Sequence, residues 1–163
     1  MAHLSPLGWI HLIFALTAVF VGTIVVFMRK GTRGHRTMGH IYFTSMLGTN
    51  ITALFIYRLT GTINFFHIAA FLSLISLSVG MGAVIFRWPK KSWLNLHGAM
   101  VTGSYVGVLA AFFAEITTRI PGVHFGLAVG ATTAVVTAVG VYFIMTRMDA
   151  AIRNMNPRRA GGD

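Results

Sequence analysis

Histidine is the chemically capable residue that this sequence supplies in quantity. The chain of 163 residues has seven histidines, no cysteine and only three acidic residues. Without cysteine it cannot form disulfides, zinc–thiolate sites, iron–sulfur clusters or the covalent bonds of c-type haem. Neutral imidazoles can still bind haem iron or zinc. A bound cofactor would therefore have to rest mainly on histidine.

The spacing of the histidines places them at two matched depths. His11 and His67 lie about one turn inside one end of their predicted helices. His97 lies near the opposite end, with His40 at its level and His35 about a turn further out. Alternate helices of an up-down bundle can face each other, and two facing imidazoles are the ligands of a six-coordinate b-type haem. We expect His11 and His67 to hold an outer haem b, and His97 with His35 or His40 to hold an inner one.

Small residues favour this haem hypothesis, because they would leave room for flat macrocycles between the helices: Gly22, Gly80, Gly82, Gly103 and Gly107. Each histidine taken alone has a simpler interpretation. Near a membrane surface an imidazole can bond a lipid headgroup or a backbone carbonyl without any cofactor. The matched depths are what favour haem over this alternative.

Glu115 offers a second chemistry, since it is the only acid in the membrane-facing part of the predicted structure. It lies at the outer level, where an alternative zinc site would combine it with three imidazoles, a set that can bind Zn²⁺ and activate water. Those three belong to His11, His67 and His124. The simpler interpretation is an ion pair, either with Arg119 at i+4 or with Arg58.

The elements that must position these residues are membrane-spanning helices. Residues of the set AVILMFWYC make up 55% of the chain, charged residues only 10%, and the mean hydropathy is +0.73. A soluble domain carries about 25% charged residues. We expect an all-α integral membrane bundle, with an up-down four-helix core and a fifth helix. Five stretches are long enough to cross about 30 Å of hydrocarbon: Leu7–Met28, Gly39–Leu59, Ile63–Phe86, Leu96–Ala114 and Val123–Met145.

The charge distribution predicts the orientation. The net charge is +10, and eleven of the 13 Lys and Arg residues fall between the first two spans, between the third and fourth, or after the fifth. The positive-inside rule makes that side cytoplasmic, with the N-terminus outside and the C-terminus inside an inner (plasma) membrane. Residues 1–147 would form the transmembrane domain and 148–163 a cytoplasmic polar tail. The basic loops lack stacking aromatics, so we expect contact with anionic lipid and no nucleic acid.

Residues 7–59 and 63–114 show the pattern of an internal repeat. Each half has a histidine near the start of its first span, a basic loop, and a His-x-x-Met near the start of its second. The corresponding pairs are Ile10-His11 and Phe66-His67, Arg29 and Arg87, and His35-x-x-Met38 and His97-x-x-Met100. The predicted fifth helix, residues 123–145, lies outside the repeat and carries a small-residue face made of Gly126, Gly130, Ala134 and Ala138.

Two resemblances follow from these motifs. The stretch Lys30-Gly-Thr-Arg-Gly-His35-Arg36-x-x-Gly39, with Phe66-His67 and His97-x-x-Met100, resembles a family of small, uncharacterised bacterial multi-pass membrane proteins. The layout of one histidine per helix is similar to that of the transmembrane ascorbate and ferric reductase b-type cytochromes. Those cytochromes carry electrons between two bis-His haems in a four-helix core. This second resemblance implies a transmembrane oxidoreductase, with a quinone or a small-molecule electron donor as partner.

Two other functions remain open from the sequence. The first is an intramembrane zinc-dependent hydrolase built on the alternative site around Glu115. The second is a cofactor-free accessory subunit of a larger membrane complex, or a homo-oligomer, that uses the small-residue face of the last helix as its contact surface. Bound haem, bound zinc or neither would distinguish the three hypotheses.

Overall fold

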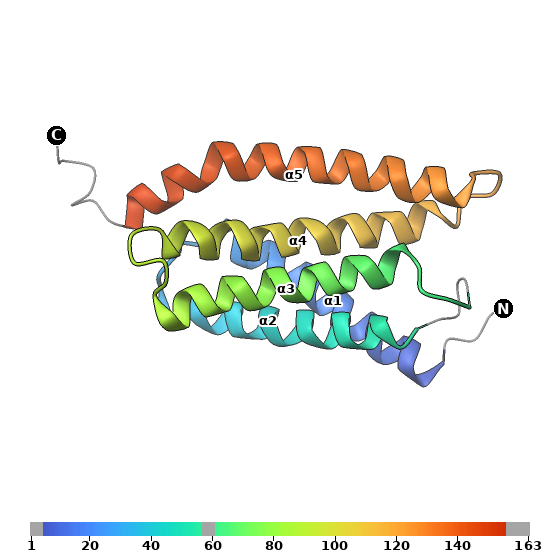
Figure 1. The fold of residues 1–163 in the computed structure, drawn as a ribbon, viewed down its shortest axis with the longest axis horizontal. Helices are drawn as coiled ribbons and strands as arrows, with labels where there is room; N and C mark the ends of the chain where they lie inside the picture. Colours follow the sequence, from blue (N-terminus) through green and yellow to red (C-terminus); the bar gives the residue numbers. More distant parts are fainter. Residues whose placement is uncertain (1–4, 57–60, 156–163) are drawn as a thin grey trace. The chain divides into compact units, whose positions relative to one another are not determined.

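The computed structural model describes residues 5–56 and 61–155, with side chains described as far as residue 146. Within these residues the chain forms α-helices joined by short loops, and it forms no strand (Figure 1). The prediction of an all-α fold is therefore confirmed. The helices are α1 (Pro6–Phe27), α2 (Arg33–Leu54), α3 (Phe65–Phe86), α4 (Trp93–Thr117) and α5 (Phe125–Met155).

The starts of α1 and α3 follow from local capping. The Ser5 hydroxyl accepts a hydrogen bond from the Gly8 N–H at 3.1 Å, and a proline follows it in the first helical turn. The Asn64 side-chain oxygen accepts the Phe66 N–H at 2.9 Å. Both contacts satisfy a backbone donor that has no partner within the helix. Side chains adjacent in the sequence therefore set these two helix starts.

Four of the described helices are long and apolar enough to cross a membrane. Each has at least 22 residues, which corresponds to about 33 Å at 1.5 Å per residue. The predicted ends of these spans agree with the observed ones to within three residues. The four segments are Pro6–Phe27, Phe65–Phe86, Trp93–Thr117 and Phe125–Thr146. Helix α5 continues beyond its apolar part to Met155.

Helix α2 departs from the sequence prediction. It covers Arg33–Leu54 instead of Gly39–Leu59, because Gly31, with φ 77°, turns the chain directly after α1. Residues 57–59 of the predicted span lie outside the described part of the chain. The hydropathy of α2 is too low for it to count among the apolar helices, so the fifth span stays a prediction. The buried side chains of α2 nevertheless form one face, with three polar members: Tyr42, Ser45, Met46, Thr49 and Asn50.

Two compact units divide the chain, and the first contains α1, α2 and α3 as far as Ile75. Here α1 packs against α2. A Cβ added to Gly48 would lie 2.6 Å from the ring of Phe14, so the glycine allows this ring to approach the backbone of α2. The Asn50 side-chain amide donates to the Ser73 hydroxyl at 3.0 Å, which links α2 to α3.

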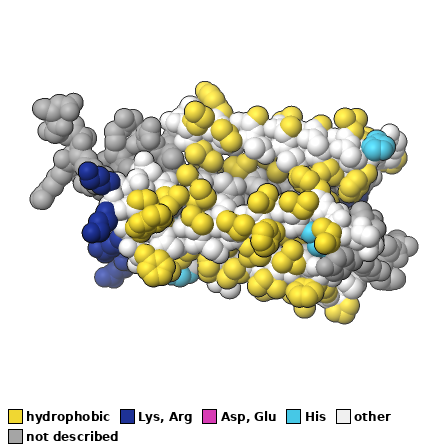
Figure 2. Space-filling view, in the orientation of Figure 1, with side chains coloured by type: hydrophobic (Ala, Val, Ile, Leu, Met, Phe, Trp, Pro, Cys, Tyr) yellow, Lys and Arg dark blue, Asp and Glu magenta, His cyan; other side chains and the backbone are white. Residues whose placement is uncertain are grey.

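Small side chains face inward and large ones outward on α1. Its buried residues are Ala18, Val21, Gly22 and Val25. Its exposed face carries the large apolar residues Trp9, Ile13, Leu16, Phe20, Ile24 and Phe27. Figure 2 shows apolar side chains over much of the visible surface. This distribution is the reverse of that in a soluble protein and suits a lipid environment.

The second unit contains Arg29–Thr32 and the chain from Ser76 onward. The Ser76 hydroxyl donates to the Met100 carbonyl at 2.8 Å and joins α3 to α4. Helix α5 packs against α4, and the hydroxyls of Thr117 and Thr132 lie 3.0 Å apart between them. The predicted small-residue face of α5 does not form this contact, because all four of its residues are exposed: Gly126, Gly130, Ala134 and Ala138.

Candidate functional site

His11 is positioned by a contact between α1 and α2. Its Nδ1 lies 2.9 Å from the Thr52 hydroxyl oxygen. That hydroxyl has a single proton, which it donates to the Gly48 carbonyl at 2.6 Å. The Thr52 oxygen must therefore accept from His11. The proton of the imidazole is then on Nδ1, and Nε2 carries the lone pair.

His67 lies in the first turn of α3 and is buried, with 6% of its surface exposed. Its Nδ1 is 3.2 Å from the side-chain oxygen of Asn64. This oxygen accepts the N–H of Phe66, while the backbone N–H of Asn64 donates to the same Nδ1 at 3.4 Å. The contact with the side-chain oxygen requires a proton on Nδ1, and the contact with the backbone N–H requires a lone pair there, so the geometry fixes no tautomer for His67. The helix cap and the orientation of His67 depend on the same asparagine.

His97 is held across the contact between α4 and α3. Its Nδ1 donates to the backbone carbonyl of Gly80 at 2.9 Å. A carbonyl can only accept, so the tautomer follows directly. Gly80 also lets the helices approach, because a Cβ there would lie 2.8 Å from a methyl of Val101 and 3.1 Å from the Cβ of Met100.

Both candidates for the inner ligand of α2 lie within the helix. His40 is exposed, and its Nδ1 donates to the Arg36 carbonyl at 2.7 Å. His35 is half-buried in the first turn. The two are five residues apart, which separates their directions by about 140° around the helix. The choice between them, and the pairing of either with His97, stays a prediction.

The described geometry thus gives three histidines the same tautomer. In His11, His40 and His97 the Nδ1–H donates to an oxygen, which leaves the lone pair on Nε2. This arrangement is typical of histidines that bind a metal through Nε2, because the second hydrogen bond fixes the ring orientation. Two of the acceptors are backbone carbonyls, as the simpler interpretation of isolated histidines also expects.

The glycines that were expected to make room for haem differ from one another. The space beside Gly80 is occupied by side chains of α4, so this glycine allows the two helices to pack closely. The expectation that Gly80 leaves room for haem is therefore wrong. Gly22 is buried. Gly107 has no atom within 4 Å of an added Cβ, and Gly82 and Gly103 have only one contact each, at 3.9 and 4.0 Å.

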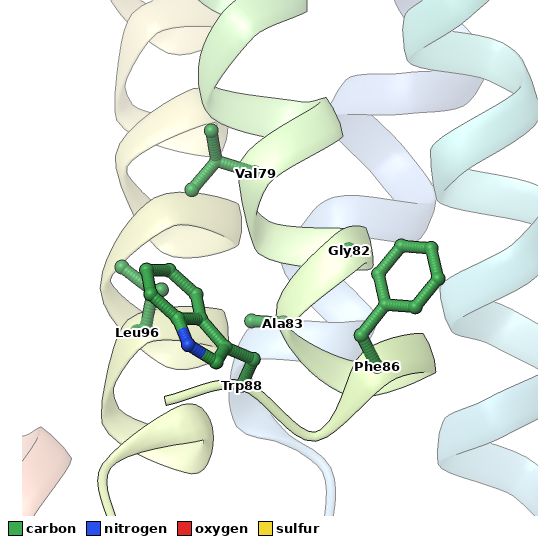
Figure 3. Close-up of a pocket in the computed structure, with 6 residues that line it drawn as sticks. All are labelled: Val79, Gly82, Ala83, Phe86, Trp88 and Leu96. Atoms are coloured by element: carbon green, nitrogen blue, oxygen red, sulfur yellow. The ribbon is translucent and has the colours of Figure 1, made fainter. Parts of the chain in front are cut away.

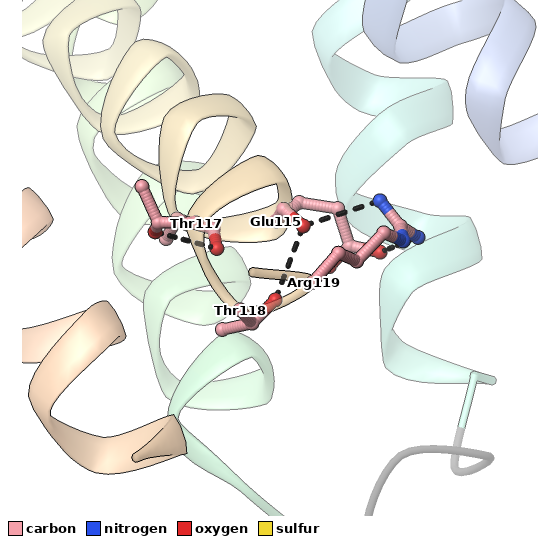
Figure 4. Close-up of polar contacts among 5 residues, drawn as sticks. Glu115, Thr117, Thr118 and Arg119 are labelled. Atoms are coloured by element: carbon pink, nitrogen blue, oxygen red, sulfur yellow. Dashed lines mark hydrogen bonds and ion pairs between the residues drawn. The ribbon is translucent and has the colours of Figure 1, made fainter. Parts of the chain in front are cut away.

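Glu115 forms an ion pair with Arg119, one of the two partners predicted for it. Its carboxylate lies 2.5 Å from the guanidinium of Arg119, one turn along α4. The same guanidinium and the Thr118 hydroxyl donate to the Glu115 carbonyl, both at 3.1 Å (Figure 4). The side chain of Arg119 is 66% exposed and that of Glu115 is 40% exposed. Arg58, the other predicted partner, lies outside the described residues.

The alternative zinc site gains no support from these contacts. Among the described side chains, those of residues 5–56 and 61–146, no three His, Asp or Glu form a group that could hold a metal ion. His124 is exposed, and its carbonyl accepts the Ala128 N–H at the start of α5. The four proposed ligands divide between the two units, His11 and His67 in the first, Glu115 and His124 in the second. The zinc site therefore stays a prediction.

A family model described as "Predicted membrane protein (DUF2306)" matches residues 8–151, which include most of α1, all of α2 to α4 and most of α5. The chain belongs to the DUF2306 family. Its apolar helices and this family membership make it a membrane protein embedded in a lipid bilayer. No curated protein matches the chain. No solved structure matches it either.

Three partners of the histidines in this DUF2306 protein are not evident as functional residues from composition or motifs. They are Thr52, Asn64 and Gly80. Asn64 has a sequence signal, since an asparagine directly before an apolar helix is a typical N-cap and His67 follows three residues later. Thr52 and Gly80 lie 41 and 17 residues from their histidines. No spacing rule within one helix could have found them.

Proposed function

We propose that this DUF2306 protein is a b-type haem protein that carries electrons within or across the membrane. Its five helices would all span the inner (plasma) membrane, with the N-terminus outside and the C-terminus inside. His11 and His67 would hold one haem, and His97 with His35 or His40 would hold a second. The observation that carries this proposal is the tautomer shared by His11 and His97, because Nε2 is the nitrogen that these two histidines would present to iron.

The chain's own residues would prepare the ligands before a haem binds. Thr52 orients the ring of His11 from α2, and Asn64 orients that of His67 from the same α3 terminus. Hydrogen bonds of this kind raise the basicity of the ligand and reduce the ring motion that binding must arrest. When bound, haem with two imidazole ligands supplies a one-electron carrier. A quinone or a small-molecule donor is the expected electron partner.

The polar inner face of α2 supports the proposal that α2 also spans the membrane. Ser45, Thr49 and Asn50 are all buried, and Asn50 is hydrogen-bonded to Ser73 of α3. Polar side chains that face the interior of a bundle lower the mean hydropathy of the helix, but they do not contact lipid. On the outside α2 presents Ile41 and Ile51.

The visible spectrum of the purified protein tests the haem proposal directly. After expression with a supply of haem, we expect a Soret band and an α-band in the reduced-minus-oxidised spectrum. His11→Ala and His67→Ala should each lose haem, while His124→Ala, a control from an exposed position, should retain it. Comparing His35→Ala with His40→Ala would identify the inner ligand on α2. A protein that folds, stays monodisperse and shows no Soret band would refute the proposal.

Elemental analysis of the same sample separates the alternatives. Stoichiometric zinc without haem would favour the hydrolase that uses Glu115, despite its ion pair with Arg119. Neither metal nor haem would favour the accessory subunit or homo-oligomer. In that case the exposed small-residue face of α5 would be the first contact surface to examine.

A further inference from the structure

Two serines of α3, Ser73 and Ser76, bond different neighbouring helices although they lie one turn apart. The Ser73 hydroxyl accepts from the side-chain amide of Asn50 on α2 at 3.0 Å. The Ser76 hydroxyl donates to the backbone carbonyl of Met100 on α4 at 2.8 Å. The boundary between the two compact units falls between these serines, directly after Ile75. Helix α3 therefore has a polar anchor in each unit.

Apolar packing gives little directional control over the position of α3 along its axis. Its exposed side chains include Leu72 and Ile75, and lipid tails are as apolar as these residues. Where α3 ends and α4 begins, an apolar cavity of about 340 Å³ has Trp88 and Leu96 on one side and Phe86 on the other (Figure 3). Hydrogen bonds between helices are then the directional contacts that fix the level of α3.

The anchor in the first unit joins α3 to the part of α2 that holds His11. Asn50 is buried, with 5% of its surface exposed, so little water competes for its hydrogen bond to Ser73. Thr52, two residues further along α2, accepts the hydrogen bond of the His11 imidazole at 2.9 Å. Helix α2 thus holds α1 and α3 through side chains that lie within one turn of each other.

His67 lies on the same helix as Ser73 and six residues before it, which is about 9 Å along the helix axis. The bond from Asn50 to Ser73 therefore fixes the level of His67 relative to His11, because both histidines are placed against α2. Two imidazoles that bind one iron must approach it from opposite faces. A shift of α3 along its axis would change how His67 meets that iron.

We propose that Asn50 and Ser73 are positioning residues for the outer haem, because they hold α3 at the level at which His67 reaches the iron bound by His11. This inference rests on the haem proposal for His11 and His67. Asn50 and Ser73 act through the position of α3 and not as ligands. Ser76 provides the comparison, since its bond to Met100 belongs to the other unit.

The level of α3 can be measured without haem. The chain has no cysteine, so Ile41→Cys with Leu72→Cys gives two labelling positions, both exposed, one on α2 and one on α3. Electron paramagnetic resonance then reports the distance between the two spin labels in the whole protein. Asn50→Leu with Ser73→Ala removes both bonding partners, so neither is left buried and unpaired, and the fold should be kept. We expect a shifted or broader distance distribution in this variant, and an unchanged distribution would refute the anchoring role.

The outer haem provides the second readout. The low-spin ferric resonance of a haem with two imidazole ligands depends on the angle between the ring planes, and the signal that is lost in His11→Ala belongs to the outer haem. We expect Asn50→Leu with Ser73→Ala to shift this signal and to weaken haem binding at this site about tenfold. Ser73→Thr retains the hydroxyl and should keep both properties. If the label distance moved while the signal and the haem affinity stayed the same, the proposal would be wrong.

Ser76→Ala is the matched control for Ser73→Ala. Both substitutions remove a hydroxyl that bonds a neighbouring helix, from positions one turn apart on α3. We expect Ser73→Ala to shift the signal of the outer haem and Ser76→Ala to leave it unchanged. An equal shift in both variants would show general loosening of α3 and would overturn the positioning role. A folded protein without a Soret band would refute the haem proposal, and this role of Asn50 and Ser73 with it. The spin labels distinguish the two failures, because they report the level of α3 in either case.

Discussion

The packing of α5 against α4 can be tested by adding a single methyl group at Gly140. A Cβ at this position would lie 2.5 Å from Cγ1 of Val106 and 3.1 Å from its Cβ, and it would also meet Cγ2. Carbon atoms pack best at about 3.5–4.0 Å, so the overlap with Cγ1 is about 1 Å. Since both methyls of the valine are in the way, rotation of its side chain cannot relieve the contact. The helices must separate, and overpacking of this kind costs about 1–3 kcal/mol.

Gly130→Ala is the matched control for Gly140→Ala. Gly130 lies on the same helix and has nothing within 4 Å of an added Cβ. Both substitutions gain the same helix propensity, about 1 kcal/mol, so the difference between them isolates the packing cost. We expect Gly140→Ala to unfold more easily than Gly130→Ala by about 1–3 kcal/mol.

The assay is reversible unfolding in mixed micelles, followed by circular dichroism during titration with dodecyl sulfate. Adding Val106→Ala to Gly140→Ala should recover part of the loss, because the two residues are in contact and their effects are coupled. If Gly140→Ala and Gly130→Ala had the same stability to within about 0.5 kcal/mol, the close approach of α5 to α4 would be wrong.

Three further predictions follow from single contacts. Thr52→Val removes the hydroxyl that accepts from His11 and should weaken haem binding about 10–100-fold in a reconstitution titration. Thr52→Ser keeps a hydroxyl and should retain the affinity for haem. Unchanged haem binding in Thr52→Val would contradict the argument that His11 carries its proton on Nδ1. Glu115→Gln breaks an exposed ion pair and should change the free energy of unfolding by less than about 1 kcal/mol; a large loss of stability or of a bound cofactor would show a role beyond this pair. Burial lowers the pKa of the Lys30 ammonium in the folded protein, so the unfolded chain binds the Lys30 proton more tightly than the folded chain does. The free energy of unfolding should therefore rise as the pH increases from the pKa of Lys30 in the folded state toward its pKa in the unfolded state. Lys30→Gln should reduce this rise in the free energy of unfolding at alkaline pH, as measured by equilibrium unfolding at several pH values. If the variant and the unchanged protein showed the same pH dependence, Lys30 would not be its cause.

The four apolar spans could be predicted closely because the signal is local. A run of about 20 apolar residues is sufficient to identify a span, and caps such as Ser5 and Asn64 set helix starts from adjacent side chains. Helix α2 was predicted less well. Its buried polar residues make its hydropathy low, and the turn at Gly31 starts it earlier than its apolar part suggests.

The candidate site was predictable only in part. The ion pair of Glu115 with Arg119 was found because i+4 neighbours on a helix always lie close together. Gly80 was misread as space for a cofactor, since a glycine in a sequence carries no information about which atoms fill its side-chain position. The structure shows that it allows α4 to approach and supplies the carbonyl that holds His97.

The sequence by itself determined that this protein lies in a membrane as helices. Composition and apolar length decide this, because transfer from water to lipid depends on the residues of each segment taken alone. Only the tertiary structure decided which nitrogen of His11 and His97 carries the proton. Their partners, Thr52 and Gly80, come from other helices, and the position of an acceptor across a helix contact depends on packing that no local spacing specifies.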